Sequence, residues 1–322
     1  MNHTPTPVRL LAIPIAGRET ASSRLRLHDI IPELPARFEP TILTPREDAD
    51  LEAHDPSGFD VIYIQKDARA EVLEFAKRAA AAGVPVIYDI DDDFGTWPSM
   101  DEATMCQLAT SVTVDSPGRA EALRGLTRTE PVVLPCMIDL AGDPARQSPH
   151  RRRGDVTTVA SFGNLVSLRN TLDYMSAAAA HHDTYLIGPA DAGQELPGHR
   201  VVPFNVATFV ADLLAADVFI LAHGDNEAPL KDNNRLIMAM SLGIPCLVSP
   251  SPAYLDVLAE LGLEWLTCGP EEVGARLAVL ADPSLRAKIG RLCSTYAWAH
   301  YRPQRCADIL AGVLDTDSEG VS

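Results

Sequence analysis

The chain lacks the features of a membrane, exported or nucleic-acid-binding protein. No apolar run in its 322 residues reaches the length of about 20 that a membrane span needs, and the N-terminus has no basic-then-apolar export pattern. Lysine and arginine number 27 against 44 aspartate and glutamate, and nothing resembles a basic stripe. We therefore expect a cytoplasmic protein without a transmembrane segment and without a nucleic-acid partner.

Clustered cysteines and a dinucleotide fingerprint are also missing. None of the six cysteines forms a C-x-x-C pair, which argues against structural metal sites and disulfide frameworks and favours a reducing compartment. No G-x-G-x-x-G follows any expected strand, which disfavours an ordinary dinucleotide-binding fold. We expect all six cysteines to be reduced: Cys106, Cys136, Cys246, Cys268, Cys293 and Cys306.

What the sequence does contain is a repeated alternation of short β-branched runs and longer alanine- and leucine-rich segments. The continuous apolar character of the runs indicates strands buried on both faces, and therefore parallel sheets with right-handed crossovers. Strands are expected at residues 8–15, 40–43, 61–65, 84–90, 111–114, 131–134, 156–162, 184–187, 199–202, 216–222, 245–249 and 264–267. Helices are expected at residues 22–31, 69–82, 102–109, 119–126, 168–181, 206–215, 233–242, 254–260 and 270–280, and again over 284–313 with a break near Pro303.

The chain is too long for one ordinary core, and the alternation occurs twice. We expect an α/β protein of two doubly wound, Rossmann-like domains facing each other across a cleft, with a break near residues 144–155. The basic cluster at 151–153 is interpreted as a solvated linker. The expected domains are 1–148, 149–297 and a C-terminal helix and tail, 298–322, that packs back on the first domain.

Residues 228–249 read as a loop with cations, an apolar helix, a Gly-Ile-Pro turn and a buried strand. Lys231 and Arg235 are four residues apart at the helix start, so both can lie on one face, and Asn234 adds a neutral donor. Free backbone N–H groups and the positive end of the dipole make this a candidate diphosphate site. The alternative is that these are solvent-facing residues at the start of a helix.

Two further loops follow expected strands. Gly163 and Asn164 open the first loop of the second domain, where a glycine allows close backbone approach to a phosphate; a plain strand-to-helix turn is the alternative. Gly17 and Arg18 occupy the matching loop of the first domain. Arg24 and Arg26 are two residues apart, so we expect at most one of them to point at the cleft and the other to lie on the surface.

Four aspartates, Asp89, Asp91, Asp92 and Asp93, close the strand expected at 84–90. Strand alternation would send Asp92 to one side and the other three to the opposite side. Close carboxylates raise one another's pKa, which suits a general base for an acceptor hydroxyl. Magnesium binding and a solvated turn remain alternatives.

Four stretches in this order resemble the GT-B glycosyltransferases, and specifically the large family 4 type. They are the Ala-Ser-Ser-Arg-Leu-Arg loop within residues 17–26, the strand and aspartates of 86–93, the Leu-Pro-Cys-Met-Ile-Asp run within 133–139, and residues 228–249. The resemblance implies a hexosyltransferase-like enzyme that uses a nucleotide diphosphate sugar as substrate, with no metal or other cofactor and with retention at the anomeric carbon. It places Asp91 and Asp92 at the acceptor side.

The same resemblance implies ligand contacts along the strand ends. Lys66 and His223 follow strands at this edge, and Ser249 and Tyr254 flank the last loop; structural roles are the alternative for the last three. The family usually has a ribose-binding glutamate where Met238 stands and a second glutamate at Leu230. With both absent, Glu227 is the nearest candidate to replace them.

The sequence therefore predicts transfer of a sugar from a nucleotide sugar to an acceptor hydroxyl of unknown identity. Lys231 and Arg235 would neutralise the leaving diphosphate without metal. Two alternatives stay open: a GT-B-like protein that binds a nucleotide or sugar without transfer, and a metal-dependent hydrolase that uses the aspartates of residues 89–93.

Overall fold

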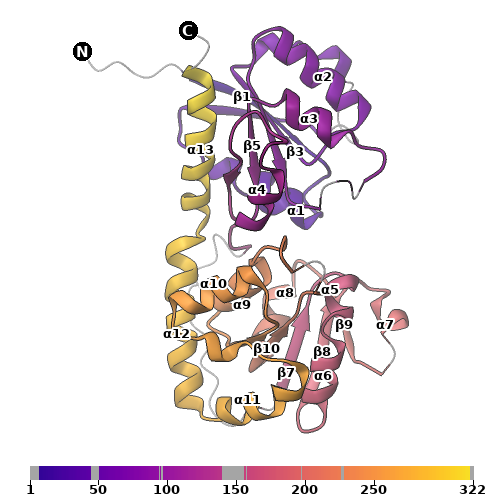
Figure 1. Cartoon of the computed structure of the whole chain (residues 1–322), viewed down its shortest axis with the longest axis vertical. Coiled ribbons are helices and arrows are strands. Elements are labelled where there is room, and N and C mark those ends of the chain that lie inside the picture. Colours follow the sequence, from indigo (N-terminus) through magenta and orange to yellow (C-terminus); the bar gives the residue numbers. More distant parts are fainter. Residues whose placement is uncertain are drawn as a thin grey trace, which may run out of the picture. The chain divides into compact units, whose positions relative to one another are not determined.

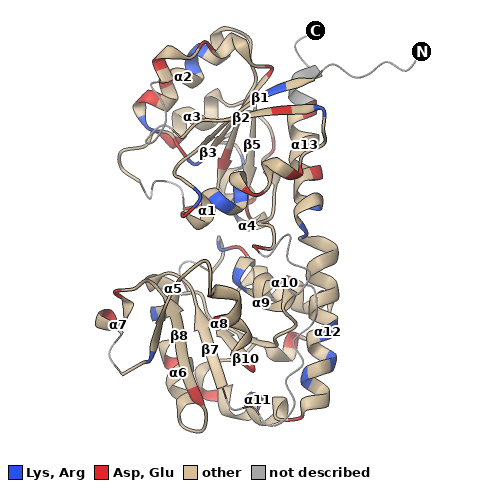
Figure 2. Cartoon of the chain, turned by 180° about the vertical axis from the view of Figure 1, so that it is seen from behind, with Lys and Arg blue, Asp and Glu red and all other residues tan. Residues whose placement is uncertain are grey.

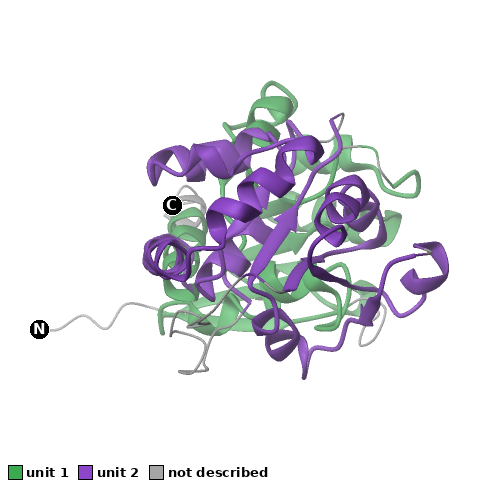
Figure 3. Cartoon of the chain, turned by 90° about the horizontal axis from the view of Figure 1, so that it is seen from below, with its two compact units in different colours: residues 1–137, 303–322 green, residues 138–302 purple. Residues whose placement is uncertain are grey.

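The computed structural model describes residues 7–44, 51–93, 95, 97–139, 156, 158–196, 198–225 and 228–319, with side chains up to residue 315. The chain divides into two compact units, shown in Figure 3: residues 1–137 with 303–322, and residues 138–302. The domain boundaries expected from the sequence were 148/149 and 297/298. The expected break at 144–155 and the basic cluster at 151–153 lie outside the described residues.

Unit 1 is built on a sheet of six parallel strands in the order β2-β1-β3-β4-β5-β6 (Figure 1). The strands are β1 (Val8–Pro14), β2 (Phe38–Ile42), β3 (Val61–Gln65), β4 (Val86–Ile90), β5 (Ser111–Val114) and β6 (Val132–Val133). The helices are α1 (Ala21–Ser23), α2 (Ala70–Ala81), α3 (Glu102–Leu108), α4 (Pro117–Leu123) and α13 (Pro303–Glu319).

Both faces of this sheet are covered, which explains why its strands are apolar without alternation. In β3, Ile62 and Ile64 pack into the core that α2 and α3 share. Val61 and Tyr63 point the other way and pack against residues of α13, such as Leu310. The chain thus leaves unit 2 and returns to unit 1 with its last helix, after a break at Arg302 as the sequence predicted.

Unit 2 contains five parallel strands in the order β11-β10-β7-β8-β9. They are β7 (Thr158–Phe162), β8 (Asp183–Gly188), β9 (Val201–Pro203), β10 (Val218–Leu221) and β11 (Cys246–Val248). The helices are α5 (Leu165–Arg169), α6 (Leu172–Ala179), α7 (Ala192–Glu195), α8 (Phe209–Leu214), α9 (Asn234–Ser241), α10 (Pro252–Glu260), α11 (Val273–Leu280) and α12 (Pro283–His300). Acidic and basic segments are interspersed along both units (Figure 2).

Two expected elements are wrong. Residues 264–267 form a 3₁₀ turn, Glu264–Leu266, and keep only one bridge to β11, because the spacing of Leu263 and Leu266 buries both on one side of a turn. The helix expected at 22–31 is the short α1 followed by a π-helical segment, Arg24–His28, and a separate 3₁₀ turn.

The strand orders locate a switch point in each sheet. In unit 2, the chain runs outward from β7 to β8 and β9, then crosses back to β10 and β11 on the other side, so the reversal falls between β7 and β10. In unit 1 the reversal falls between β1 and β3. In open parallel sheets, ligands bind beyond the carboxyl ends of the strands at this position.

Candidate functional site

Arg235 lies across the switch point of unit 2. It is the second residue of α9, and its guanidinium donates from Nη2 to the carbonyl oxygen of Ala222 at 2.8 Å and from Nη1 to that of Phe162 at 3.4 Å. These carbonyls follow β10 and end β7, the two strands that flank the reversal. The side chain is therefore held where a ligand of this sheet would bind, and it is not an unconstrained surface cation.

The loop after β7 passes directly beneath Arg235. Gly163 has φ +151°, and a Cβ there would lie 2.9 Å from Ser167 Cβ and 3.5 Å from the Arg235 side chain. Only glycine fits this conformation and this space. The side chain of Asn164 is engaged locally, since its Oδ1 accepts a 2.8 Å hydrogen bond from the Ser167 amide and caps α5.

His223 joins the same group from the end of β10. It is buried, and the pKa of its imidazole is lowered to about 3, first by burial and then by the positive charges of Arg235 and Lys231. The positive charges of Arg235 and Lys231 therefore oppose protonation of this ring. Lys231 lies in the loop that leads into α9, and Asn234 is the first residue of α9; both are half-buried.

A hydrogen-bonded layer behind His223 fixes its ring. Its Nδ1 lies 3.2 Å from Ser251 Oγ and its Nε2 3.0 Å from the Tyr254 hydroxyl, and the Tyr254 ring stacks on it with centroids 4.4 Å apart. Its backbone N–H donates to Ser249 Oγ at 3.0 Å. Tyr254 is fully buried and Ser249 nearly so. These two predicted contact residues therefore support His223 from within the domain.

The structure describes one of the two residues that bear on the missing ribose-binding carboxylate. Met238 is buried within the hydrophobic core of unit 2, so its side chain supplies no ribose acceptor. Glu227, the expected substitute, lies outside the described residues.

In unit 1, the carboxyl end of β4 is tied to Arg26. Arg26 Nε donates to Asp89 Oδ2 at 2.6 Å, Nη2 pairs with Oδ1, and Nη1 donates to the Leu134 carbonyl at 2.8 Å. Thr113 Oγ1 donates to Asp89 Oδ1 at 2.5 Å. Neither the Arg26 nor the Asp89 side chain is exposed. The pair is a buried structural clamp beneath the strand ends.

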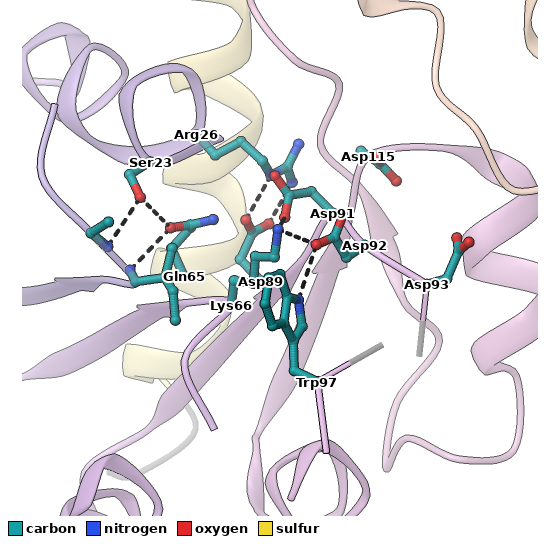
Figure 4. Close-up of polar contacts among 12 residues, drawn as sticks. Ser23, Arg26, Gln65, Lys66, Asp89, Asp91, Asp92, Asp93, Trp97 and Asp115 are labelled. Carbon is teal, nitrogen blue, oxygen red and sulfur yellow. Dashed lines mark hydrogen bonds and ion pairs between the residues drawn. The ribbon is translucent and has the colours of Figure 1, made fainter. Parts of the chain in front are cut away.

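Above this clamp, Lys66 gathers the next two aspartates (Figure 4). Its Nζ pairs with Asp92 Oδ2 and lies 3.4 Å from Asp91 Oδ1. Trp97 Nε1 donates to Asp92 Oδ2 at 3.2 Å, and Lys66 Nζ lies 5.9 Å from the centre of the Trp97 ring. Burial raises the pKa of the Asp91 carboxyl, while Lys66 opposes that shift.

The expected alternation of the aspartates is wrong. β4 ends at Ile90, so the chain turns before it could send Asp91 and Asp92 to opposite sides, and both meet Lys66. Asp93 points elsewhere and pairs with Arg119 at 3.2 Å.

Lys66 itself has φ +62°, a left-handed conformation that is rare for a residue with a side chain. Among the residues described, no group of three or more His, Cys, Asp or Glu side chains is placed to hold a metal ion. The aspartates of this edge are instead engaged by cationic side chains.

The first loop of unit 1 differs from its expected arrangement. Arg24 and Arg26 are both buried, which contradicts the prediction that one lies on the surface. The π-helical segment explains this, since it buries four successive residues, Arg24–Leu27. Arg24 donates to the Arg18 carbonyl at 3.0 Å, whereas Arg18 is exposed and pairs with Asp29. Gly17 is half-buried, and its carbonyl accepts from the Thr20 amide at 3.1 Å.

Two participants escaped the sequence analysis. Trp97 follows the aspartates by four residues and was not considered, although a lone tryptophan beside a charged strand end is a usable signal. Ser251 was not singled out either, because its contact with His223 depends on a tertiary packing that no local pattern reveals. No helix in the described part of the chain is long and apolar enough to cross a membrane.

No family model and no curated protein sequence matches the chain. Solved structures do. An α-glucosyltransferase in complex with UDP and a 13-mer DNA containing an HMU base matches with a TM-score of 0.66 at 8% identity, over 96% of this chain and 100% of that one. An O-GlcNAc transferase mutant from Thermobaculum terrenum matches with a TM-score of 0.61 at 13% identity, over 98% of this chain and 68% of that one.

A UDP-GlcNAc 2-epimerase from Neisseria meningitidis, bound to UDP-GlcNAc, matches with a TM-score of 0.53 at 11% identity, over 96% of this chain and 100% of that one. Matches at sequence identities this low show similarity of fold alone. Together with the two parallel sheets, they show that this chain has the two-domain α/β fold of the GT-B glycosyltransferases.

Proposed function

We propose that the protein is a glycosyltransferase that moves a sugar from a nucleoside diphosphate sugar to an acceptor hydroxyl. The observation that carries this proposal is the position of Arg235, bonded to the carbonyls that end β7 and follow β10 at the switch point of unit 2. The Gly163 loop packs against Arg235, and Lys231 lies in the loop that leads into α9. A pyrophosphate is the ligand that two cations, a close backbone approach and the N-terminus of α9 suit best.

In this reaction the bond between the anomeric carbon and the β-phosphate oxygen breaks. A bond from the anomeric carbon to the acceptor oxygen forms, and the acceptor proton is released. The leaving nucleoside diphosphate gains negative charge, which Lys231 and Arg235 stabilise without a metal ion. His223 stays neutral at physiological pH, and both of its ring nitrogens are bonded within unit 2, so it adds no charge beside the diphosphate. Asn234 is proposed as an additional neutral donor.

On the acceptor side, Asp91 is the proposed base. Its raised pKa brings it closer to neutral pH, where a carboxylate accepts a proton more readily. Asp92 and Lys66 hold it in place. We further propose that transfer retains the anomeric configuration, as in the family that the sequence resembles.

One observation favours a second function. Met238 is buried where the family has a ribose-binding carboxylate, and the missing carboxylate favours a protein that binds a nucleotide or sugar without transfer. A single experiment separates the two. The protein is incubated with UDP-, GDP-, ADP- and dTDP-sugars and a mixture of acceptors, and the released nucleoside diphosphate is quantified.

The transferase proposal predicts release from at least one donor, unchanged by chelator and reduced at least about 100-fold in Asp91→Asn, as for loss of a general base. The matched control is Asp60→Asn, since Asp60 is an exposed carboxylate of unit 1 that pairs with Arg9. Binding of a nucleotide or a sugar without any release supports the second function. Activity that chelator abolishes would instead favour a metal-dependent hydrolase.

A further inference from the structure

Trp97 is an exposed aromatic residue with a fixed ring. The residue is 44% exposed, yet its indole N–H is bonded to Asp92 and its ring lies beside the Lys66 ammonium. Fixing a side chain in this way removes rotamer freedom that a free surface tryptophan would keep. A large apolar face that is held still in solvent is suited to receiving another apolar face.

Asp91 adds a carboxylate oxygen that is ion-paired with Lys66 but accepts no hydrogen bond. Its side chain is 9% exposed, and its Oδ1 accepts no hydrogen bond, since Lys66 Nζ lies 3.4 Å away without the geometry of one. Gln65, the last residue of β3, has the same property: it is fully buried, and its Nε2 has no hydrogen-bond acceptor. In Figure 4 this nitrogen is turned toward the group of charged side chains.

Leaving a buried polar atom without a hydrogen bond costs about 1–3 kcal/mol. Two such atoms at neighbouring strand ends point to partners that a ligand supplies.

The chemistry of the group selects among ligands. Lys66 with Asp91 and Asp92 carries one net negative charge, which disfavours phosphates and other anions. A purely apolar ligand would cover Asp91 Oδ1 without bonding to it. A pyranose ring has both required features, because its C–H face packs on an aromatic ring while its hydroxyl groups donate to carboxylates and accept from amides or ammonium groups.

We infer that Trp97, Asp91, Asp92 and Lys66 form a subsite for a neutral sugar ring, with the ring on the exposed face of Trp97 and a hydroxyl bonded to Asp91 Oδ1. The acceptor of the reaction is then a saccharide. That last step rests on the proposed function, whereas binding of the sugar ring does not.

The test measures sugar binding by unit 1 without any nucleotide. The probes are the methyl pyranosides of glucose, galactose, mannose and N-acetylglucosamine, and the corresponding disaccharides, at millimolar concentrations. Binding to the full chain is followed by saturation-transfer difference NMR and by titration. We expect at least one probe to bind, with affinity reduced about tenfold or more in Trp97→Ala, reduced less in Trp97→Phe, and reduced in Asp91→Asn.

The matched control is Leu126→Ala, because Leu126 is an apolar residue of unit 1 with nearly the same exposure, 43%. It should bind the probe as the unchanged protein does. Failure of every probe to bind overturns the inference, as does undiminished binding by a folded Trp97→Ala variant. The donor assay reads out separately: nucleotide release with no sugar binding leaves the proposed function standing, and sugar binding with no nucleotide release leaves the subsite standing.

Discussion

Replacing Arg26 by methionine should weaken unit 1 more than any exposed substitution. The change removes the cation from a fully buried pair and leaves the Asp89 carboxylate bonded to the Thr113 hydroxyl. It also removes the 2.8 Å bond to the Leu134 carbonyl. Breaking one partner of a buried pair costs about 3–5 kcal/mol, which is a large part of the stability of a domain.

Native-state hydrogen exchange with mass spectrometry measures this loss of stability for individual segments of the chain. A loss of about 3–5 kcal/mol should speed exchange of the β4 amides by roughly 10²–10³-fold or more, while peptides from β7 in unit 2 serve as the internal control. The matched variant is Arg9→Gln, whose pair with Asp60 is exposed and should change exchange by no more than about fivefold.

A double variant tests the cause. Arg26→Met with Asp89→Leu removes both charges, leaves only neutral groups unpaired, and should recover part of the lost protection. Exchange of β4 in Arg26→Met that stays within about fivefold of the unchanged protein would refute the buried-clamp reasoning.

Three further predictions concern unit 2. The pKa of His223 is lowered to about 3, so the free energy of unfolding that depends on its neutral form is fully present above the unfolded pKa of 6.5 and falls as the pH drops toward 3. Urea unfolding should show a loss of about 2 kcal/mol between pH 7 and pH 5, and the His223→Gln variant should lack this loss. Gly163→Ala should weaken nucleoside diphosphate binding about tenfold, measured by calorimetry, because its Cβ would lie 2.9 Å from Ser167 Cβ in a backbone conformation with φ +151°, which forces the loop that packs on Arg235 to shift. Unchanged affinity would contradict this packing. Gly290→Ala should lower the melting temperature by several degrees, because its Cβ would lie 2.2 Å from the Gly243 carbonyl oxygen. The control Gly274→Ala has open space at its Cβ and should be neutral or slightly stabilising. Equal effects of the two substitutions on the melting temperature would argue against this contact.

Continuous apolar runs made the fold readable from the sequence. β3 and β5 have the bounds that were expected, because each is a short β-branched segment between clear turn signals. The resemblance to GT-B enzymes led to the right fold despite identities near 10% to the solved structures. The π-helical segment Arg24–His28 was not readable, since its period departs from that of an α-helix and no residue type encodes it.

The site was readable only in part. Arg235 and Lys231 could be singled out because cations at a helix start oppose the dipole and therefore suggest a ligand. The destination of the Arg235 guanidinium, two carbonyls 73 and 13 residues away, is set by strand order and is invisible to local patterns. The pairing of Asp91 and Asp92 with one lysine likewise depends on where β4 stops.

Arg235 and Lys231 are proposed to bind the pyrophosphate of a nucleotide sugar. Calorimetric titration with UDP, GDP, ADP and dTDP tests it most directly, comparing Lys231→Ala and Arg235→Gln with the exposed cation controls Lys288→Ala and Arg291→Gln on α12. Each loss of a charge-assisted contact should cost about 1.5–3 kcal/mol, so affinity should fall roughly 10- to 100-fold in the two site variants and stay unchanged in the controls. Equal affinities in folded site and control variants, or no binding of any of the four nucleotides to the unchanged protein, would contradict the account.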